Sequence, residues 1–103
     1  MSVSIIIPAY NEAEGIVETI RRVKNSSPQD AEIIVVDDGS VDETYKKAKK
    51  MGVKVYKHER NMGKASALCT GFGKATGDIL VTIDADCAFS EQFFVEGLNK
   101  LKN

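Results

Sequence analysis

The sequence predicts an α/β fold of three layers, in which a mainly parallel sheet of about four strands lies between four helices. Short apolar runs rich in β-branched residues alternate with segments whose apolar residues recur at helical spacing. The run at 32–37 is apolar throughout its middle and the run at 79–83 is apolar along its length, as expected for parallel strands buried on both faces. A strictly alternating order of strands and helices favours right-handed crossovers that build one sheet.

The first strand and helix occupy the first quarter of the chain. Residues 3–8 are apolar and β-branched, and the strand ends at Pro8. Asn11, with Glu14 three residues later, has the pattern of a capping box and predicts the start of a helix. The segment 25–28 (NSSP) ends that helix. Its apolar face carries Ile16, Ile20 and Val23.

The second unit repeats this pattern. Residues 32–37 (EIIVVD) form a strand, and Ser40 with Glu43 forms a second capping box. The helix that follows extends to about Met51, where Gly52 is suited to its C-terminal cap.

Two further strands and two helices complete the prediction. Residues 53–57 alternate in polarity, so this strand lies near an edge and is half exposed. A helix covers about 63–76, and the fourth strand covers 79–83. Ser90 caps a last helix. The apolar positions of these two helices are Ala65, Leu68, Cys69 and Phe72 in the first, and Phe94, Leu98 and Leu101 in the second.

Three polar segments follow predicted strands, at 9–12, 37–40 and 84–86. In open parallel sheets, ligands bind beyond the carboxyl ends of the strands. We therefore expect these three segments to converge on one site.

The segment 84–86 contains two carboxylates, Asp84 and Asp86, separated by Ala85. In an extended segment such residues point the same way, and two carboxylates repel unless a cation lies between them. A hard ion such as Mg²⁺ or Mn²⁺ takes oxygen ligands and shares them with substrate phosphates. A short acidic pair is a weak signal alone, and its place after a buried strand strengthens it.

Other polar residues allow both structural and functional interpretations. Asp37 suits a turn with Gly39, whereas the carboxylate of Asp38 could accept a hydrogen bond from the imide N–H of uracil or guanine. Lys64 at a helix start suits a diphosphate, and a solvated lysine is an equal alternative.

His58 is interpreted as a surface loop residue. The glycines at 71 and 73 do not match a dinucleotide-binding fingerprint.

Composition excludes several classes of protein. The chain has 103 residues, which suits a single domain, and 14 basic against 15 acidic side chains give a net charge of -1. No basic surface for nucleic acid or for an anionic membrane is expected. Two cysteines and one histidine argue against a zinc site. No apolar run approaches the length of a membrane span, so we expect a cytoplasmic protein.

Three motifs in the right order resemble glycosyltransferase family 2. They are SIIIPAYNE at 4–12, EIIVVDDGSVDET at 32–44 and NMGKASALCTGFGKATGDILVTIDAD at 61–86, and the match covers most of 3–87. Within this family, the sequence is most similar to polyprenyl-phosphate (dolichyl-phosphate) mannosyl- and glucosyltransferases. The resemblance implies the Rossmann-like GT-A fold and a single nucleotide-sugar-binding domain over 1–103. It also implies inverting transfer from a UDP- or GDP-sugar to a polyprenyl phosphate or glycan, at the cytoplasmic face of a membrane.

The resemblance also implies roles for single residues. Asp38 would hold the base edge, Lys64 would lie near the ribose or phosphates, and Asp84 would face the ribose and the metal, with Ala85 beside it. Asp86 would coordinate Mg²⁺ or Mn²⁺ bridging the diphosphate. The nucleoside pocket would be lined by Pro8, Ala9, Tyr10 and Glu12.

Two departures from the family pattern bear on activity. Some relatives place a glutamine two residues after the second aspartate, where this chain has Ala88. In the family the acceptor site and general base follow this motif, and no catalytic residue is identified before Asn103. We therefore expect a truncated chain with weak donor binding, little transfer, and self-association or a missing C-terminal half.

Two alternatives remain open at this point. A non-catalytic nucleotide-sugar-binding module, or one half of a split enzyme, would share every binding residue. A phosphoacceptor receiver domain would also place acidic residues after strands, as at Asp38 and Asp84. Against the receiver, its acidic pair follows the first strand, whereas here a strand and a helix precede it.

Overall fold

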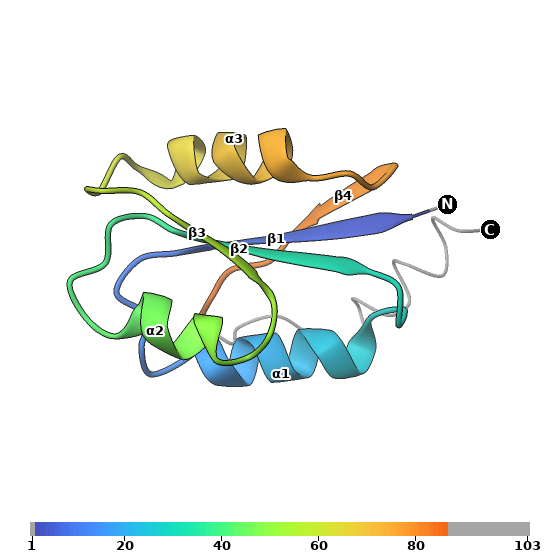
Figure 1. Ribbon diagram of the computed structural model, residues 1–103, viewed down its shortest axis with the longest axis horizontal. Helices are drawn as coiled ribbons and strands as arrows, with labels where there is room; N and C mark the ends of the chain where they lie inside the picture. Colours follow the sequence, from blue (N-terminus) through green and yellow to red (C-terminus); the bar gives the residue numbers. More distant parts are fainter. Residues whose placement is uncertain (1, 87–103) are drawn as a thin grey trace.

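The computed structural model describes residues 2–86 and contains a four-stranded sheet between two helical layers (Figure 1). The predicted three-layer α/β fold is confirmed. The helix predicted from Ser90 lies outside the described residues. The strands are β1 (Val3–Ala9), β2 (Glu32–Asp37), β3 (Lys54–Lys57) and β4 (Ile79–Thr82). The helices are α1 (Ile16–Ser26), α2 (Thr44–Lys49) and α3 (Lys64–Lys74).

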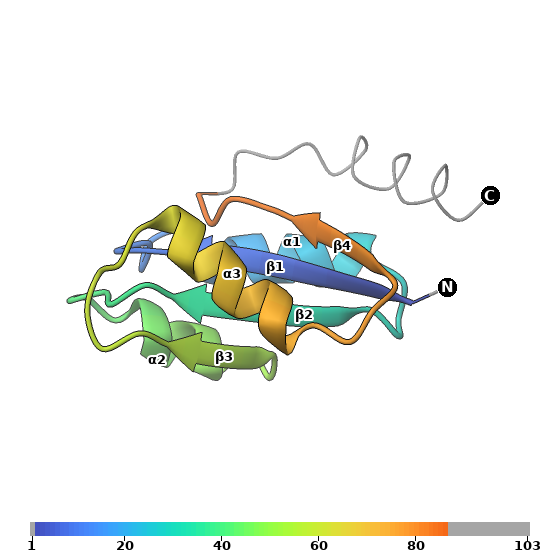
Figure 2. The same cartoon turned by 90° about the horizontal axis from the view of Figure 1, so that it is seen from above.

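The four strands are all parallel and lie in the order β3-β2-β1-β4. The chain moves outward from β1 to β2 and β3, and then returns across the sheet to β4. Helices α1 and α2 cover one face and α3 covers the other, as Figures 1 and 2 show together. The order of the strands therefore reverses between β1 and β4, which is where open sheets of this kind form a crevice.

The main core lies between α1 and the sheet. Ile16, Ile20 and Val23 of α1 are fully buried, so the helical face predicted for these three residues is confirmed. They pack against the side chains of β1 and β2 that point to the same face, which are Ile5, Ile7 and Val35. A smaller cluster lies under α3 and contains Ile34, Val36 and Ala67.

Both predicted capping boxes are wrong. Helix α1 begins at Ile16 and α2 at Thr44, and the residue before each forms no capping hydrogen bond through its side chain. Asn11 instead has a φ of 52°, and its backbone N–H donates to Ser40 Oγ at 2.8 Å. The N–H of Val41 donates to Asn11 Oδ1 at 3.0 Å. These polar residues join two loops rather than cap two helices.

The exposure of the two outer strands differs from one to the other. β3 lies at an edge and is half exposed, as predicted. β4 was predicted to be buried on both faces, which is wrong within the described residues. Ile79 and Val81 pack on the α1 core, whereas Leu80 is 46% exposed. The cause is that α3 lies over β1 and β2 and leaves the corresponding face of β4 open.

The residues of α3 that meet the sheet differ from the apolar positions that mark this helix in the sequence. Ala67 and Gly71 are the buried residues, whereas Cys69 and Phe72 are exposed. A Cβ at position 71 would lie 2.5 Å from Cγ2 of Ile6. Small side chains thus let the helix backbone approach β1 closely, and the larger apolar residues lie away from this contact.

We expect Gly71→Ala to lower the free energy of unfolding by about 1–3 kcal/mol, because the added methyl group must displace the fully buried Ile6. Gly73→Ala is the matched control, since a Cβ there meets nothing within 4 Å. In the same helix it should stabilise the protein by about 0.5–1 kcal/mol. Urea denaturation of both variants measures the difference, and equal stabilisation by both would contradict the close packing of α3.

Candidate functional site

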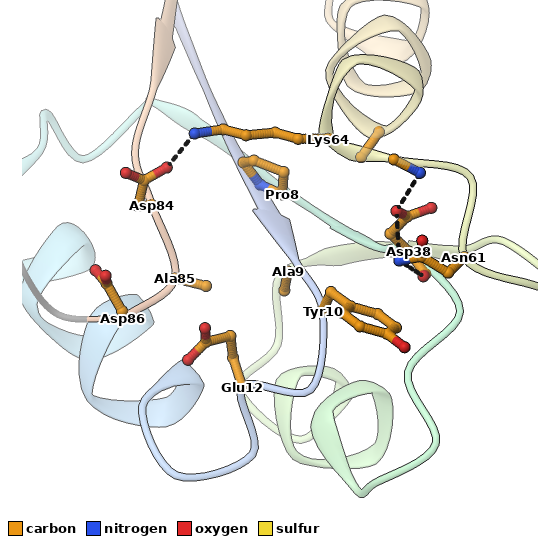
Figure 3. Close-up of a pocket in the computed structure, with 12 residues that line it drawn as sticks. Pro8, Ala9, Tyr10, Glu12, Asp38, Asn61, Lys64, Asp84, Ala85 and Asp86 are labelled. Atoms are coloured by element: carbon orange, nitrogen blue, oxygen red, sulfur yellow. Dashed lines mark hydrogen bonds and ion pairs between the residues drawn. The ribbon is translucent and has the colours of Figure 1, made fainter.

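A cavity of about 430 Å³ opens at the carboxyl ends of the strands, beside the reversal between β1 and β4. The structure brings all nine residues predicted from the sequence around this one cavity (Figure 3). Its volume falls within the range of small-molecule sites. The lining residues are Pro8, Ala9, Tyr10, Glu12, Asp38, Asn61, Gly63, Lys64, Ala67, Asp84, Ala85 and Asp86.

The loop after β1 forms one wall and is fixed by the loop before α2. In addition to the Asn11–Ser40 contact, the backbone N–H of Glu12 donates to Thr44 Oγ1 at 2.8 Å. Ser40 and Thr44 are buried, so the hydroxyl groups that accept these hydrogen bonds are shielded from water. Tyr10 directly precedes the two anchored residues and is 45% exposed, which leaves its ring available on the cavity wall.

Asp38 lies at the end of β2 and is almost completely buried. Its carboxylate accepts hydrogen bonds from the backbone N–H groups of Met62 at 2.9 Å and Gly63 at 2.8 Å. The side chain of Asn61 donates at 3.1 Å, and Nδ1 of His58 lies 2.8 Å away. Burial raises the pKa of Asp38, but these hydrogen bonds outweigh it and hold the pKa below its usual value.

These contacts place a condition on the predicted role of Asp38. An ionised carboxylate has about four acceptor positions, and four internal donors occupy them here. A nucleobase that bonded to Asp38 would have to replace one of these donors. The hydrogen bond to the base stays a prediction, and the observed contacts fix the loop that precedes α3.

Two other interpretations from the sequence have clear outcomes. His58 was taken for a surface loop residue, which is wrong, because its ring bridges Asp38 and Thr70 and its side chain is only 13% exposed. The turn interpretation of Asp37 is confirmed, because its Oδ1 accepts the backbone N–H of Ser40 at 3.2 Å.

Lys64 and Asp84 form an ion pair across the mouth of the cavity (Figure 3). The Lys64 Nζ and Asp84 Oδ1 atoms are 2.8 Å apart, and both side chains are 63% exposed. The hydrogen bond with Asp84, together with its charge, raises the pKa of Lys64 above its usual value. An ion pair this exposed is weak, so both groups can exchange partners when a ligand enters.

The acidic segment after β4 is anchored through its backbone. The N–H of Ile83 donates to the carbonyl of Ile6 at 3.0 Å, and the hydroxyl of Thr19 donates to the carbonyl of Ala85 at 3.0 Å. The sequence analysis treats this segment as extended, but Ala85 and Asp86 lie in a turn. The start of α1 packs here, since a Cβ on Gly15 would lie 3.1 Å from the Ala85 carbonyl.

Negative charge gathers on this side of the cavity. Burial raises the pKa of Glu12, and the nearby charges of Asp86, Asp42 and Asp84 raise it further. A cation would relieve this repulsion. Carboxylate oxygens suit Mg²⁺ or Mn²⁺, and Mg²⁺ typically takes one or two protein carboxylates with waters and substrate phosphates. The donor set of Asp84 and Asp86 therefore fits such an ion, although no three acidic, histidine or cysteine residues within 2–86 form a metal cluster.

Asn61, Gly63 and Ala67 line the cavity but were not assigned to it from the sequence. All three follow β3, whereas the three polar segments identified in the sequence follow β1, β2 and β4. Applying the same rule to the loop after β3 would have found Asn61 and Gly63. Ala67 is not among the apolar positions that mark this helix in the sequence, and only the packing of α3 on the sheet places it at the cavity.

The strand order and the position of the cavity define an α/β domain with the GT-A architecture. The structure superposes on glucosyl-3-phosphoglycerate synthase from Mycobacterium tuberculosis, solved with Mn²⁺, UDP and phosphoglyceric acid, with a TM-score of 0.73 and 32% identity. That match covers 82% of this chain and 32% of the other. Staphylococcus aureus TarS gives a TM-score of 0.85 at 25% identity, over 99% of this chain and 32% of TarS.

The chain belongs to glycosyl transferase family 2, whose model matches residues 4–103. It is 38% identical over 108 residues to a dolichol-phosphate mannosyltransferase from Pyrococcus furiosus, across 100% of this chain and 31% of the relative. It is 40% identical to an undecaprenyl-phosphate 4-deoxy-4-formamido-L-arabinose transferase from Enterobacter, across 82% of this chain and 28% of the relative. The chain thus spans about a third of the length of these relatives.

We expect Asp38→Asn to lower the free energy of unfolding by about 1–3 kcal/mol at pH 7, because an amide nitrogen would face two N–H donors. The folded pKa of Asp38 lies below its usual 3.8, so its stabilisation is complete above that pH and is lost as pH falls through the folded pKa. Denaturation curves between pH 7 and pH 3 should therefore show the gap to wild type narrowing below about pH 4.

The matched control for this prediction is Asp30→Asn, at an exposed residue before β2. It should change the free energy of unfolding by less than about 0.5 kcal/mol. A gap for Asp38→Asn that stayed constant over the whole pH range would show that the ionised carboxylate is not the stabilising group.

Proposed function

We propose that this chain forms the donor-binding part of a glycosyltransferase that uses a UDP- or GDP-sugar and transfers the sugar with inversion. The observation that carries the proposal is the single cavity in which an exposed aromatic ring, a lysine at a helix start and two carboxylates meet. Solved structures of glucosyl-3-phosphoglycerate synthase contain UDP with Mn²⁺ or Mg²⁺, which supports a nucleoside diphosphate as the ligand.

In this proposal each part of the nucleotide meets a different wall. The end of β1, with Pro8 and Ala9, and the following Tyr10 lie against the nucleoside, and the ring of Tyr10 offers an apolar face to the base. Lys64 and the N–H groups at the start of α3 bind the diphosphate, for which a helix N-terminus is suited. Asp38 holds that helix start in place through Met62 and Gly63.

Asp86 and Asp84 would hold Mg²⁺ or Mn²⁺ beside the diphosphate. A bound divalent ion neutralises charge on the departing nucleoside diphosphate. In this proposal Asp84 exchanges Lys64 for the ion, and Lys64 then becomes available to the phosphates. The exposed pair thus links entry of the ion to entry of the nucleotide.

The acceptor we propose is a polyprenyl phosphate, with a glycan as the alternative. Support comes from the two curated relatives, whose names specify dolichol phosphate and undecaprenyl phosphate. No helix in the described part of the chain is both long and apolar enough to cross a bilayer. We propose that transfer takes place at the cytoplasmic face of the membrane that holds the acceptor.

Calorimetric titration tests the donor site directly. UDP or GDP should bind in the presence of Mn²⁺, and Asp86→Ala should weaken that binding at least about tenfold, because it removes a carboxylate ligand. Asp30→Ala, the same change at an exposed residue before β2 and therefore at the amino ends of the strands, should leave the affinity unaltered. The proposal fails if neither nucleotide binds at millimolar concentration with Mn²⁺ present.

Lys64→Met should change the affinities for metal and nucleotide in opposite directions. Without nucleotide, the free Asp84 carboxylate should bind Mn²⁺ more tightly, and electron paramagnetic resonance of free Mn²⁺ measures this. UDP should bind several-fold more weakly, because the diphosphate loses a cation. Lys46→Met on the exposed surface of α2 is the control and should change neither affinity. If Lys64→Met raised both the Mn²⁺ and the UDP affinity, or lowered both, the proposed exchange of partners by Lys64 and Asp84 would be contradicted.

A further inference from the structure

His58 follows β3, and its ring bridges the end of β2 and helix α3. Its backbone N–H donates to the carbonyl of Asp37 at 2.9 Å and extends the pairing of β2 with β3. The ring Nδ1 lies 2.8 Å from Asp38 Oδ1, and Nε2 lies 2.8 Å from Oγ1 of Thr70 on α3. The histidine therefore ties the end of β2 to the middle of α3 without lining the cavity itself.

The two ring contacts require a defined pattern of donors. Asp38 is an ionised carboxylate with a lowered pKa, so Nδ1 carries a proton and donates to it. In the neutral imidazole Nε2 is then the acceptor, and the hydroxyl of Thr70 donates. Each group has a complementary partner, so the bridge is fully satisfied and holds the carboxylate in one orientation.

The orientation of Asp38 controls how the chain enters α3. The same carboxylate accepts the backbone N–H groups of Met62 and Gly63. Gly63 has a φ of 101°, a conformation that side-chain-bearing residues rarely adopt, and Lys64 begins the helix directly after it. A rotated carboxylate would release both N–H groups and let Lys64 move relative to the cavity.

We propose that His58 is a positioning residue for the diphosphate side of the cavity, acting through Asp38 on the segment from Asn61 to Lys64. This inference rests on the proposed donor site. Partners that orient a binding group often affect ligand affinity nearly as strongly as the group itself. Thr70 contributes to the same positioning, because its hydroxyl is hydrogen-bonded to Nε2 of His58.

Four variants of the 103-residue chain test the role of His58 and Thr70. His58→Phe keeps a ring and removes both hydrogen bonds, whereas His58→Asn retains an amide donor near the position of Nδ1. Thr70→Val removes the hydroxyl with little change in volume, and Thr70→Ser keeps it. For each variant we would measure the dissociation constant of UDP with Mn²⁺ and the NMR amide proton shifts of Met62 and Gly63.

His58→Phe should weaken UDP binding roughly tenfold, which corresponds to about 1.4 kcal/mol. The amide protons of Met62 and Gly63 should move upfield as their hydrogen bonds to Asp38 lengthen. His58→Asn should keep the UDP affinity and the two amide proton shifts close to those of wild type. Thr70→Val should shift both measurements in the same direction by a smaller amount, and Thr70→Ser should match wild type.

Unchanged amide shifts and unchanged UDP affinity in His58→Phe would overturn the positioning role. If that variant does not fold, Thr70→Val decides in its place, and wild-type values in Thr70→Val would overturn the role equally. Failure of the wild-type chain to bind any nucleoside diphosphate is a different result. It overturns the proposed function, whereas normal wild-type binding that His58→Phe leaves intact overturns only the inference about His58.

Discussion

The parallel pairing of β1 with both β2 and β4 is the constraint on which the rest of the molecule depends. Because β1 is central, its apolar side chains are buried on both faces, and helices must cover both faces of the sheet. The crossovers therefore leave on opposite sides, α1 on one face and α3 on the other. The segments that follow β1 and β4 both line the cavity at the carboxyl ends of these strands.

Hydrogen bonds of buried polar groups then give the cavity its shape. Ser40 and Thr44 hold the loop after β1, Asp38 holds the segment before α3, and Thr19 holds the turn after β4. Each bond joins residues distant in sequence and has a buried side chain as one partner, which makes the walls firm. The Lys64–Asp84 pair is different, because it is exposed and weak enough to change partners. The site thus combines a fixed frame with a movable pair of charges.

The sequence predicted the strands, their parallel arrangement and the polar loops, because these depend on apolar runs and on the general geometry of parallel sheets. It failed where a residue's partner is distant. Asn11 and Ser40 resemble helix caps, but they bond to each other's loops. Gly71 is buried because Ile6 lies beneath it, and the sequence does not show that these two residues meet. The partners of His58, Asp38 and Thr70, are likewise known only from the fold. The function of the cavity residues remains a proposal from the resemblance and the geometry.

The assembly of the cavity from four separate loops has a thermodynamic consequence. Residues 9, 38, 64 and 84 approach one another only after the sheet has formed, so an unfolded chain has no comparable site. Any ligand of this cavity is therefore linked to folding and adds RT ln(1 + [L]/Kd) to stability, about 2.7 kcal/mol at a hundredfold excess over Kd. The melting temperature of the chain thus reports on occupancy, and comparing its rise among nucleotides ranks the bases without any assay of sugar transfer.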